Sequence, residues 1–384
     1  MADAKAAQSA RAPHPARWDV VIVGGGPAGL ATAIAATGQG LSVLVLERRA
    51  FPPDKVCGEG VLPPGVRALE HLGVFPYLDR RWTHRFSGIR FIQEDRSSIE
   101  ALLPGAGGLG IRRTALVEAM TRRAQDLGAV VRHQCAVYRV VREPTQVVVH
   151  TSVGTVCGRM VVAADGLNSL LRRTAGLEAD SSWRRRFALR QHFRVQPWTD
   201  LVEVYVDRVG EAVVTPVSDD CVNVNFVWED GVIAEPGVQS LARRFPALQL
   251  RLAGAPRISS AQGAGPMPRR VTGRCSDRMA LVGDAAGFVD SISGDGLSVA
   301  LNSALLLGRH LPAVLADGAM RASMRTYERA ARRLFRRYWL VTTGLLVLAR
   351  HPRARAAAIN YLATHRAIGA ALTRRAMQMM VSVA

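Results

Sequence analysis

Apolar runs and helical repeats alternate along most of the chain. Short runs rich in valine, isoleucine, leucine and alanine occur at residues 20–23, 41–46, 160–163 and 279–282, and each suits a strand buried on both faces. Residues 111–127 instead place leucine and methionine side chains on one side of a helix. Because buried strands separated by helices are typical of a layered α/β fold, the sequence predicts an α/β domain with a parallel sheet.

The period changes to two in the middle of the chain. Apolar side chains occupy every second position over residues 187–195, 202–206 and 222–228, which is typical of antiparallel strands with one face in the core and one in water. Residues 86–103 alternate more weakly and predict two further strands. Because this pattern interrupts the α/β repeats, we interpret it as an inserted antiparallel β-sheet domain that binds the substrate, formed by residues 86–106 plus 181–264.

The remaining segments complete the predicted domain organisation. Residues 1–17 are rich in alanine, proline and arginine and have no apolar core, which predicts a disordered tail. Residues 105–110 contain four glycines and predict a flexible connection. Residues 316–384 form a basic helical extension at the C-terminus. The α/β domain then consists of residues 18–85 plus 107–180 plus 265–315.

A glycine-rich turn follows the first buried strand. Gly24, Gly26 and Gly29 form the pattern G-x-G-x-x-G, whose glycines allow a tight turn, close approach of a pyrophosphate and packing of helix on strand. Pro27 stands where the helix opens and no N–H is needed, and the N–H groups of a helix N-terminus suit a diphosphate. Glu47 ends the next strand, 18 residues after Gly29, near the spacing of a ribose-binding acid. Together these features predict a Rossmann-type dinucleotide site.

Two further turns of glycine and aspartate follow buried strands. Asp165 and Gly166 follow one predicted strand, and Gly283 and Asp284 follow another. Because the carboxyl ends of parallel strands meet at one crevice, where open α/β folds bind ligands, we expect the three turns to converge. Asp284 is placed to accept a hydrogen bond from a ribityl or ribose hydroxyl. A helix opens at residues 294–298, and its N–H groups are suited to stabilise negative charge.

A loop rich in proline and glycine follows Glu47. Its centre is Cys57-Gly58-Glu59-Gly60, with prolines on both sides, and this composition fixes a loop backbone rather than building a helix or strand. Cys57 and Glu59 are the candidate catalytic residues, because a thiol or a carboxyl group can donate or accept a proton. The alternative is that Cys57 is a small buried hydrophobic residue.

Composition restricts the compartment and the kind of site. The five cysteines lie far apart and are odd in number, which favours a reducing compartment over a disulfide framework. We expect a cytoplasmic protein. No cluster of histidine, cysteine or acidic residues has the spacing of metal ligands, and we therefore expect no metal site.

Arginine supplies nearly all of the positive charge of a chain whose formal net charge is +19. Residues 321–384 hold thirteen arginines and one acid. This region is interpreted either as a solvated helical face packed on the α/β domain or as a contact with an anionic membrane surface, because its arginines precede an apolar stretch. The stretch, residues 338–349, is too short to span a bilayer. Nucleic acid is not expected as a partner, because neither a recognised motif nor an aromatic platform is present.

These motifs resemble the FAD-dependent monooxygenase superfamily of group A flavoprotein hydroxylases, in the branch shared with geranylgeranyl reductase-type oxidoreductases and flavin-dependent halogenases. The resemblance rests on the three glycine turns and on Glu47. It implies FAD, with Glu47 at the adenosine ribose, Arg113 at the phosphates and Val137 in a backbone contact with adenine. The cofactor-binding residues that it implies are Gly24, Gly26, Pro27, Ala28, Gly29, Glu47, Arg48, Arg113, Val137, Asp165, Gly166, Gly283, Asp284, Gly294, Gly296, Leu297 and Ser298.

The resemblance implies monooxygenation as the reaction. NAD(P)H, a transient reductant, would reduce FAD, and O₂ would form a flavin hydroperoxide that oxidises an apolar aromatic, polyketide or prenylated substrate. The Cys57 loop instead favours the reductase branch, which saturates carbon–carbon double bonds of lipophilic substrates. Halogenation is disfavoured because residues 212–217 read AVVTPV rather than a tryptophan motif, and residues 288–291 lack the proline of many hydroxylases. A non-redox flavin-bound cyclase or lipophile carrier is the third alternative.

Overall fold

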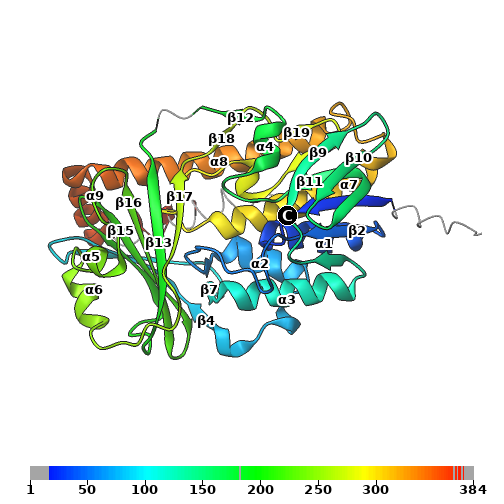
Figure 1. Cartoon of the computed structure of the whole chain (residues 1–384). Coiled ribbons are helices and arrows are strands. Elements are labelled where there is room, and N and C mark those ends of the chain that lie inside the picture. The colour runs from blue at the N-terminus through cyan, green and yellow to red at the C-terminus, as the bar shows by residue number, and fades with distance from the viewer. Residues whose placement is uncertain (1–16, 181–182, 366–367, 370, 373–374, 376–384) are drawn as a thin grey trace, which may run out of the picture.

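The computed structural model describes residues 17–180, 183–365, 368–369, 371–372 and 375. The predicted tail, apart from Arg17, lies outside the described residues. An α/β domain and a second, antiparallel sheet lie side by side, and long C-terminal helices run along both (Figure 1). This arrangement confirms the predicted fold class.

An eight-stranded sheet forms the centre of the α/β domain. Its strands are β1 (Trp18–Val23), β2 (Val43–Leu46), β8 (Val130–Arg132), β9 (Val137–Arg142), β10 (Val147–Thr151), β11 (Gly154–Ala163), β19 (Cys275–Ser276) and β20 (Met279–Leu281). The main order is β19-β20-β11-β1-β2-β8, and the hairpin of β9 and β10 continues from β11. Val20 lies between Val43 and Met160 in parallel register. All three side chains are fully buried, as the uninterrupted apolar runs predict.

Helices pack on this sheet and on one another. They are α1 (Pro27–Thr37), α2 (Pro63–His71), α3 (Arg113–Asp126), α4 (Leu170–Thr174) and α7 (Gly296–Ala316), with short 3₁₀ turns at Phe75–Tyr77, Arg80–Trp82 and Gly283–Ala286. Pro27 is the first residue of α1, as predicted. α1 contacts both α3 and α7, and their apolar side chains form a continuous core with the sheet. The N-termini of α1, α3 and α7 therefore belong to one rigid unit.

The inserted sheet takes its seven strands from two separate parts of the chain. They are β5 (Gly88–Ile92), β6 (Ser98–Leu102), β13 (Arg186–Arg194), β14 (Leu201–Val206), β15 (Gly210–Ser218), β16 (Cys221–Glu229) and β17 (Gln262–Met267). Their order is β17-β13-β16-β15-β14-β5-β6, antiparallel except for the parallel pair of β14 and β5. β17 ends at Met267, beyond the predicted domain boundary at residue 264. A two-stranded sheet pairs β12 (Glu178–Ala179), which precedes β13 in the chain, with β18 (Arg270–Val271), which follows β17.

Both faces of the inserted sheet are covered over β13, β14, β15 and β16, which corrects the prediction of one face in water. The short helices α5 (Val238–Ala242) and α6 (Pro246–Arg251) join the apolar core of one face. Asn223 and Asn225 point to the other face, yet each is at most 3% exposed. Asn223 Nδ2 donates to the carbonyl oxygen of Cys57 at 2.8 Å. The polar positions of the alternating pattern therefore contact the α/β domain instead of solvent.

A small sheet connects the two domains where a flexible connection was predicted. It consists of β3 (Gly60–Val61), β7 (Gly108–Ile111) and β4 (Thr83–Phe86), in the order β3-β7-β4. The glycines of β7 serve close packing: a Cβ on Gly108 would collide with the ring of Phe86, and one on Gly110 would collide with the carbonyl of Pro216. The prediction of flexibility was wrong because these glycines allow close approach of neighbouring groups.

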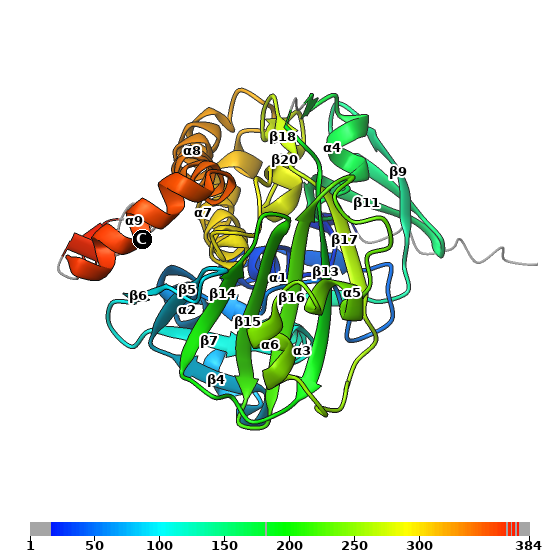
Figure 2. The same ribbon diagram turned by 90° about the vertical axis from the view of Figure 1, so that its left-hand side faces the viewer.

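The C-terminal helices α8 (Arg325–Arg350) and α9 (Pro352–Thr364) contact both domains. Phe335 and Tyr338 of α8 pack in the core of the α/β domain, whereas Val341 packs on the inserted sheet. α9 continues past the end of α8 beside β6 (Figure 2). Among the described helices, α7 has the length and apolar composition of a membrane span, but 67% of that segment is buried, as in a core helix.

Candidate functional site

The first glycine turn joins β1 to α1 and holds Glu47. Gly24 has a φ of +111°, which glycine adopts without strain, and a Cβ on Gly29 would collide with the Gly24 carbonyl. Glu47 Oε2 accepts a hydrogen bond of 2.8 Å from the Gly25 N–H, and Oε1 accepts from the Arg49 N–H. The predicted ribose-binding acid is therefore fixed directly beside the turn.

Arg113 reaches the same turn from the first residue of α3. Its Nη2 lies 3.2 Å from the position that a Cβ on Gly26 would occupy. Its Nε is buried and has no hydrogen-bond partner among the described residues. A guanidinium group and the N-terminus of α1 thus face one small space, the arrangement that favours phosphate oxygens.

The second and third turns meet at Lys55. Lys55 Nζ forms an ion pair of 3.1 Å with Asp284 Oδ2, and a Cβ on Gly166 would lie 2.9 Å from the same ammonium group. Asp165 Oδ2 accepts from the Leu171 N–H, whereas its Oδ1 is buried and has no partner in the part of the chain that the structure describes. Lys55 was not among the predicted site residues; its one distinguishing signal in the sequence is that the chain holds only two lysines.

The site residues fit an FAD molecule. The glycine turn gives room for a diphosphate, and the unpartnered Arg113 Nε together with Lys55 supplies positive charge. Asp284 and Glu47 supply acceptors for hydroxyl groups, and Asp165 has an oxygen free of protein partners. Gly283, with a φ of +58°, lets its turn pack against Ala28 and Ala300.

A cavity of about 320 Å³ extends from this cradle to the inserted sheet. Nine of the predicted cofactor residues line it: Gly26, Pro27, Ala28, Arg113, Gly166, Asp284, Gly294, Gly296 and Leu297. At the far end its walls are apolar, with contributions from β5, β14, β15 and α8: Ile89, Phe91, Val202, Val204, Val213, Val341 and Leu345. The cavity therefore joins a polar nucleotide cradle to a hydrophobic chamber.

Other predicted residues lie outside the cavity lining. Val137 is half-buried in β9 and pairs with Thr151, and Arg48 is exposed after β2. Ser298 is 3% exposed, and its Oγ lies 2.8 Å from the position of a Cβ on Gly65. The Ser298 side chain thus faces α2.

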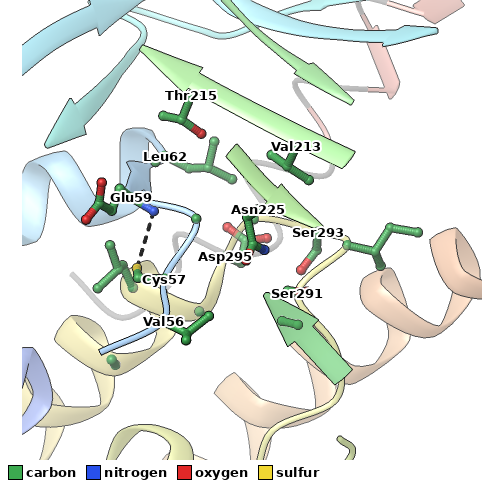
Figure 3. Close-up of a pocket in the computed structure, with 18 of the residues that line it drawn as sticks. Val56, Cys57, Glu59, Leu62, Val213, Thr215, Asn225, Ser291, Ser293 and Asp295 are labelled. Atoms are coloured by element: carbon green, nitrogen blue, oxygen red, sulfur yellow. Dashed lines mark hydrogen bonds between the residues drawn. The ribbon is translucent and has the colours of Figure 1, made fainter. Parts of the chain in front are cut away.

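Cys57 and Glu59 sit on the cavity wall between the two domains (Figure 3). Cys57 Sγ accepts a hydrogen bond from the Glu59 N–H at 3.3 Å. Burial raises the pKa of the Cys57 thiol, while the Arg113 guanidinium acts in the opposite direction. The side chain is therefore held as a thiol.

Both carboxylate oxygens of Glu59 are already bound to protein. Oε1 accepts from the Arg113 N–H at 2.8 Å, and Oε2 lies 2.6 Å from His192 Nε2. The Glu59 and His192 side chains are both fully buried. Glu59 thus caps α3 and ties the loop to β13. The sequence suggested that Glu59 donates or accepts a proton, but each of its carboxylate oxygens already has a protein partner.

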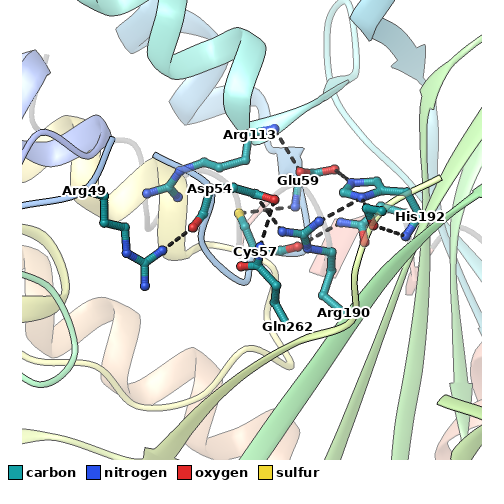
Figure 4. A network of polar contacts seen from close by, with 10 residues as sticks. Arg49, Asp54, Cys57, Glu59, Arg113, Arg190, His192 and Gln262 are labelled. Carbon is teal, nitrogen blue, oxygen red and sulfur yellow. Dashed lines mark hydrogen bonds and ion pairs between the residues drawn. The ribbon is translucent and has the colours of Figure 1, made fainter. Parts of the chain in front are cut away.

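The contact between Glu59 and His192 belongs to a larger polar network (Figure 4). Arg190 Nη1 lies 2.8 Å from His192 Nδ1, and Arg190 Nη2 forms an ion pair of 2.7 Å with Asp54. Because arginine can only donate, Nδ1 of His192 is the acceptor and its Nε2–H donates to Glu59. Gln262 Nε2 donates to the other Asp54 oxygen. The loop is thereby held from strands of the inserted sheet.

Comparisons with known proteins agree with this geometry. The family model of the FAD binding domain matches residues 17–339. The chain belongs to this FAD-binding family. A menaquinone reductase from Mycobacterium tuberculosis is 30% identical over 344 residues, covering 78% of this chain and 80% of the relative. Digeranylgeranylglycerophospholipid reductase 1 from Methanopyrus kandleri is 31% identical over 313 residues, covering 76% and 78%.

Solved structures share the fold of this FAD-binding protein. The Diels-Alderase PyrE3 has a TM-score of 0.77 at 24% identity, covering 93% of this chain and 79% of that one. A flavoprotein/dehydrogenase from Cytophaga hutchinsonii has a TM-score of 0.77 at 18% identity and covers 86% of both chains. Halogenase PltM in complex with phloroglucinol and FAD has a TM-score of 0.73 at 17% identity, covering 93% and 86%. Family and relatives together support an FAD-dependent oxidoreductase.

Proposed function

We propose that this oxidoreductase saturates a carbon–carbon double bond in an apolar, isoprenoid-type substrate. The observation that carries the proposal is the Cys57 thiol on the wall of a cavity that joins the nucleotide cradle to a hydrophobic chamber. Two relatives point the same way, because one is named a menaquinone reductase and the other a digeranylgeranylglycerophospholipid reductase. The chamber's valine, isoleucine and phenylalanine side chains suit an apolar chain.

The residues of the loop have separate roles in this reaction. Saturation adds a hydride to one carbon and a proton to the other, and FAD, when bound and reduced, supplies the hydride. Cys57 Sγ–H supplies the proton; the thiolate that remains lies near Arg113 and regains a proton from water. The Glu59 N–H and the Asn223 amide, which bind Cys57 Sγ and its carbonyl, hold the thiol in place.

Monooxygenation, which the family resemblance favoured first, remains the alternative prediction. The discriminating experiment uses holoenzyme with geranylgeraniol as the probe. Under argon, with dithionite or NAD(P)H as reductant, a reductase forms products heavier by about two mass units per saturated bond. A monooxygenase forms product heavier by about sixteen units and requires air. Oxygen-dependent product alone would refute the proposal, and loss of flavin absorbance on adding NADH or NADPH tests the nicotinamide.

A matched pair of cysteine variants tests the proton donor. Cys57→Ala should retain FAD but slow reoxidation of the reduced enzyme by substrate by about 10²-fold, the lower range for a positioned general acid. Cys157, half-buried in β11 and absent from the cavity lining, provides the control Cys157→Ala. Stopped-flow absorbance at the flavin band measures both. Equal rates for the two variants would remove Cys57 from the mechanism.

We also propose that α8 contacts an anionic membrane surface. Arg329, Arg333 and Arg336 are exposed at helical spacing and are followed on the same face by Leu340 and Val347, which are 58% and 48% exposed. Basic residues next to exposed apolar side chains on one helix face suit an anionic bilayer. The inward side of the same helix lines the cavity, so a lipophilic substrate would reach the chamber close to the lipid.

Vesicle flotation tests this contact. Replacing Arg329, Arg333 and Arg336 with glutamine should weaken binding to vesicles of phosphatidylcholine with phosphatidylglycerol by about 10²-fold, at ~1 kcal/mol for each arginine. Glutamine at the exposed Arg67, Arg139 and Arg243, which lie on other elements, makes the same charge change elsewhere. Equal loss in both triple variants, or no binding by the unmodified protein, would contradict a specific role of α8.

A further inference from the structure

Asp295 stands at the start of α7 but does not cap it. An aspartate in this position normally accepts from N–H groups of the first turn. Here the residue has nearly helical backbone angles, with φ −90° and ψ −2°, and its side chain makes no cap hydrogen bond. Asp295 is 1% exposed, and neither carboxylate oxygen has a hydrogen-bond partner among the described residues.

The Asp295 side chain lies in a polar cluster on the cavity wall. Asn225 of β16, Ser291 and Ser293 line the same cavity as Asp295, and Figure 3 draws the four side chains together. Within the described part of the chain Asn225 Oδ1 and Ser291 Oγ also lack partners, whereas Ser293 Oγ accepts from Thr342 of α8 at 3.0 Å. Unpaired buried polar atoms are rare in folded proteins, so several of them around one cavity indicate a place for a polar group of a ligand.

The surroundings of Asp295 favour its neutral acid. Burial raises the pKa of this carboxyl to about 8, because the charged form loses its hydration. The other titratable groups on the cavity wall are Lys55, Cys57, Glu59, Arg113 and Asp284. Lys55 is paired with Asp284, and Glu59 is bound to His192. At neutral pH Asp295 therefore offers an O–H donor to the cavity.

We propose that Asp295 donates a hydrogen bond to a carbonyl oxygen of the substrate at the inner end of the hydrophobic chamber. The inference rests on the proposed function and narrows its substrate class to apolar molecules that carry a ketone or quinone oxygen. A neutral acid donates a hydrogen bond to a carbonyl without bringing a charge into an apolar site. A pure hydrocarbon chain would leave the buried Asp295 carboxyl unpaired, which is unfavourable.

The expected selectivity for a ketone over a hydrocarbon follows from the unpaired Asp295 carboxyl. A site built to bind a polar group discriminates against an analogue that lacks it, because its own polar atoms then stay unsatisfied. One hydrogen bond changes affinity by several-fold to about tenfold. The effect on binding is independent of turnover, and it can therefore be measured on oxidised holoenzyme.

Farnesylacetone, an isoprenoid ketone, and farnesene, an isoprenoid hydrocarbon, serve as the two probes. Their dissociation constants are measured from changes in the flavin absorption spectrum at about pH 6.5 and about pH 9.5. At the lower pH the unmodified enzyme should bind farnesylacetone about tenfold more tightly than farnesene. At the higher pH, where the Asp295 acid ionises, this preference for the ketone should be lost. Asp295→Asn keeps an N–H donor and should show the preference at both pH values. Asp295→Ala should show none.

Thr215→Val is the matched control, since Thr215 is a buried residue of the same cavity wall and should leave the pH-dependent preference intact. Equal affinity for the two probes, or a preference that survives in Asp295→Ala, would overturn the proposal. A change in FAD affinity in Asp295→Ala with an unchanged ketone preference would assign the acid to the cofactor instead. If Asp295→Ala does not fold, the pH response of the unmodified enzyme and of Asp295→Asn decides. Selective binding without any saturated product would sustain this site while refuting the proposed reaction.

Discussion

Removal of His192 should destabilise the whole protein. His192 Nε2 lies 2.6 Å from Glu59 Oε2, and both side chains are fully buried. In His192→Ala the Glu59 carboxylate keeps one partner, the Arg113 N–H, and loses the other. An unpaired buried acceptor costs about 1–3 kcal/mol, and the cavity left by the deleted ring adds to this, so we expect a total of about 3–5 kcal/mol.

The expected change in melting temperature follows from the size of the chain. An unfolding entropy of ~2.1 cal/mol/K per residue gives ~0.8 kcal/mol/K for 384 residues. His192→Ala should therefore lower Tm by about 4–6 °C. His192→Gln retains an N–H donor for Glu59, and we expect a loss of about 1–2 °C.

Differential scanning calorimetry of holoenzyme measures these shifts. His71 lies on the surface at the end of α2, and His71→Ala should change Tm by less than about 1 °C. A Tm for His192→Ala that matches this surface control would refute the reasoning, because it would mean that the buried pair has no net effect on folding.

Three further predictions concern the cradle and the cavity. Burial raises the folded-state pKa of Asp295 to about 8. The stability that its neutral form contributes is therefore present below about pH 4 and is lost as the pH rises to about 8. Compared with Asp295→Asn, the Tm of the unmodified protein should fall between these pH values and should fall no further above them. Gly26→Leu should displace Arg113 and abolish FAD retention in gel filtration, while Gly344→Ala, which has open space around it, should stay yellow. Lys55→Met should raise the dissociation constant of FAD about tenfold or more in fluorescence titration, and an unchanged constant would exclude Lys55 from the cradle.

The parts of the site that depend on local spacing were predictable from the sequence. Gly24, Gly26, Gly29 and Glu47 are close in the chain. A buried strand, a glycine turn, a helix and an acid in this order and spacing together indicate a dinucleotide site. The convergence of the later turns followed from the rule that parallel strands end at one edge. The sequence also indicated Cys57 as a candidate, although its surroundings were unknown.

Features that depend on distant pairs could not be predicted in the same way. Glu59 and His192 are separated by 133 positions and Lys55 and Asp284 by 229, and no periodicity relates residues so far apart. The polar positions around Asn223 were correctly identified but assigned to water, because a single strand does not reveal what covers its face. The glycine-rich segment of β7 was misjudged because conformational freedom and tight packing select the same residue.

The attachment of the Cys57 loop to the inserted sheet has a consequence for altering this protein. Asn223 and His192 belong to that sheet but hold the loop, whereas Val202, Val204 and Val213 only shape the chamber. Engineered variants that accept bulkier molecules should therefore be sought at the valines. Changes at Asn223 or His192 would alter both the shape of the cavity and the position of the Cys57 thiol. Positions on the same sheet therefore differ in how many substitutions they tolerate.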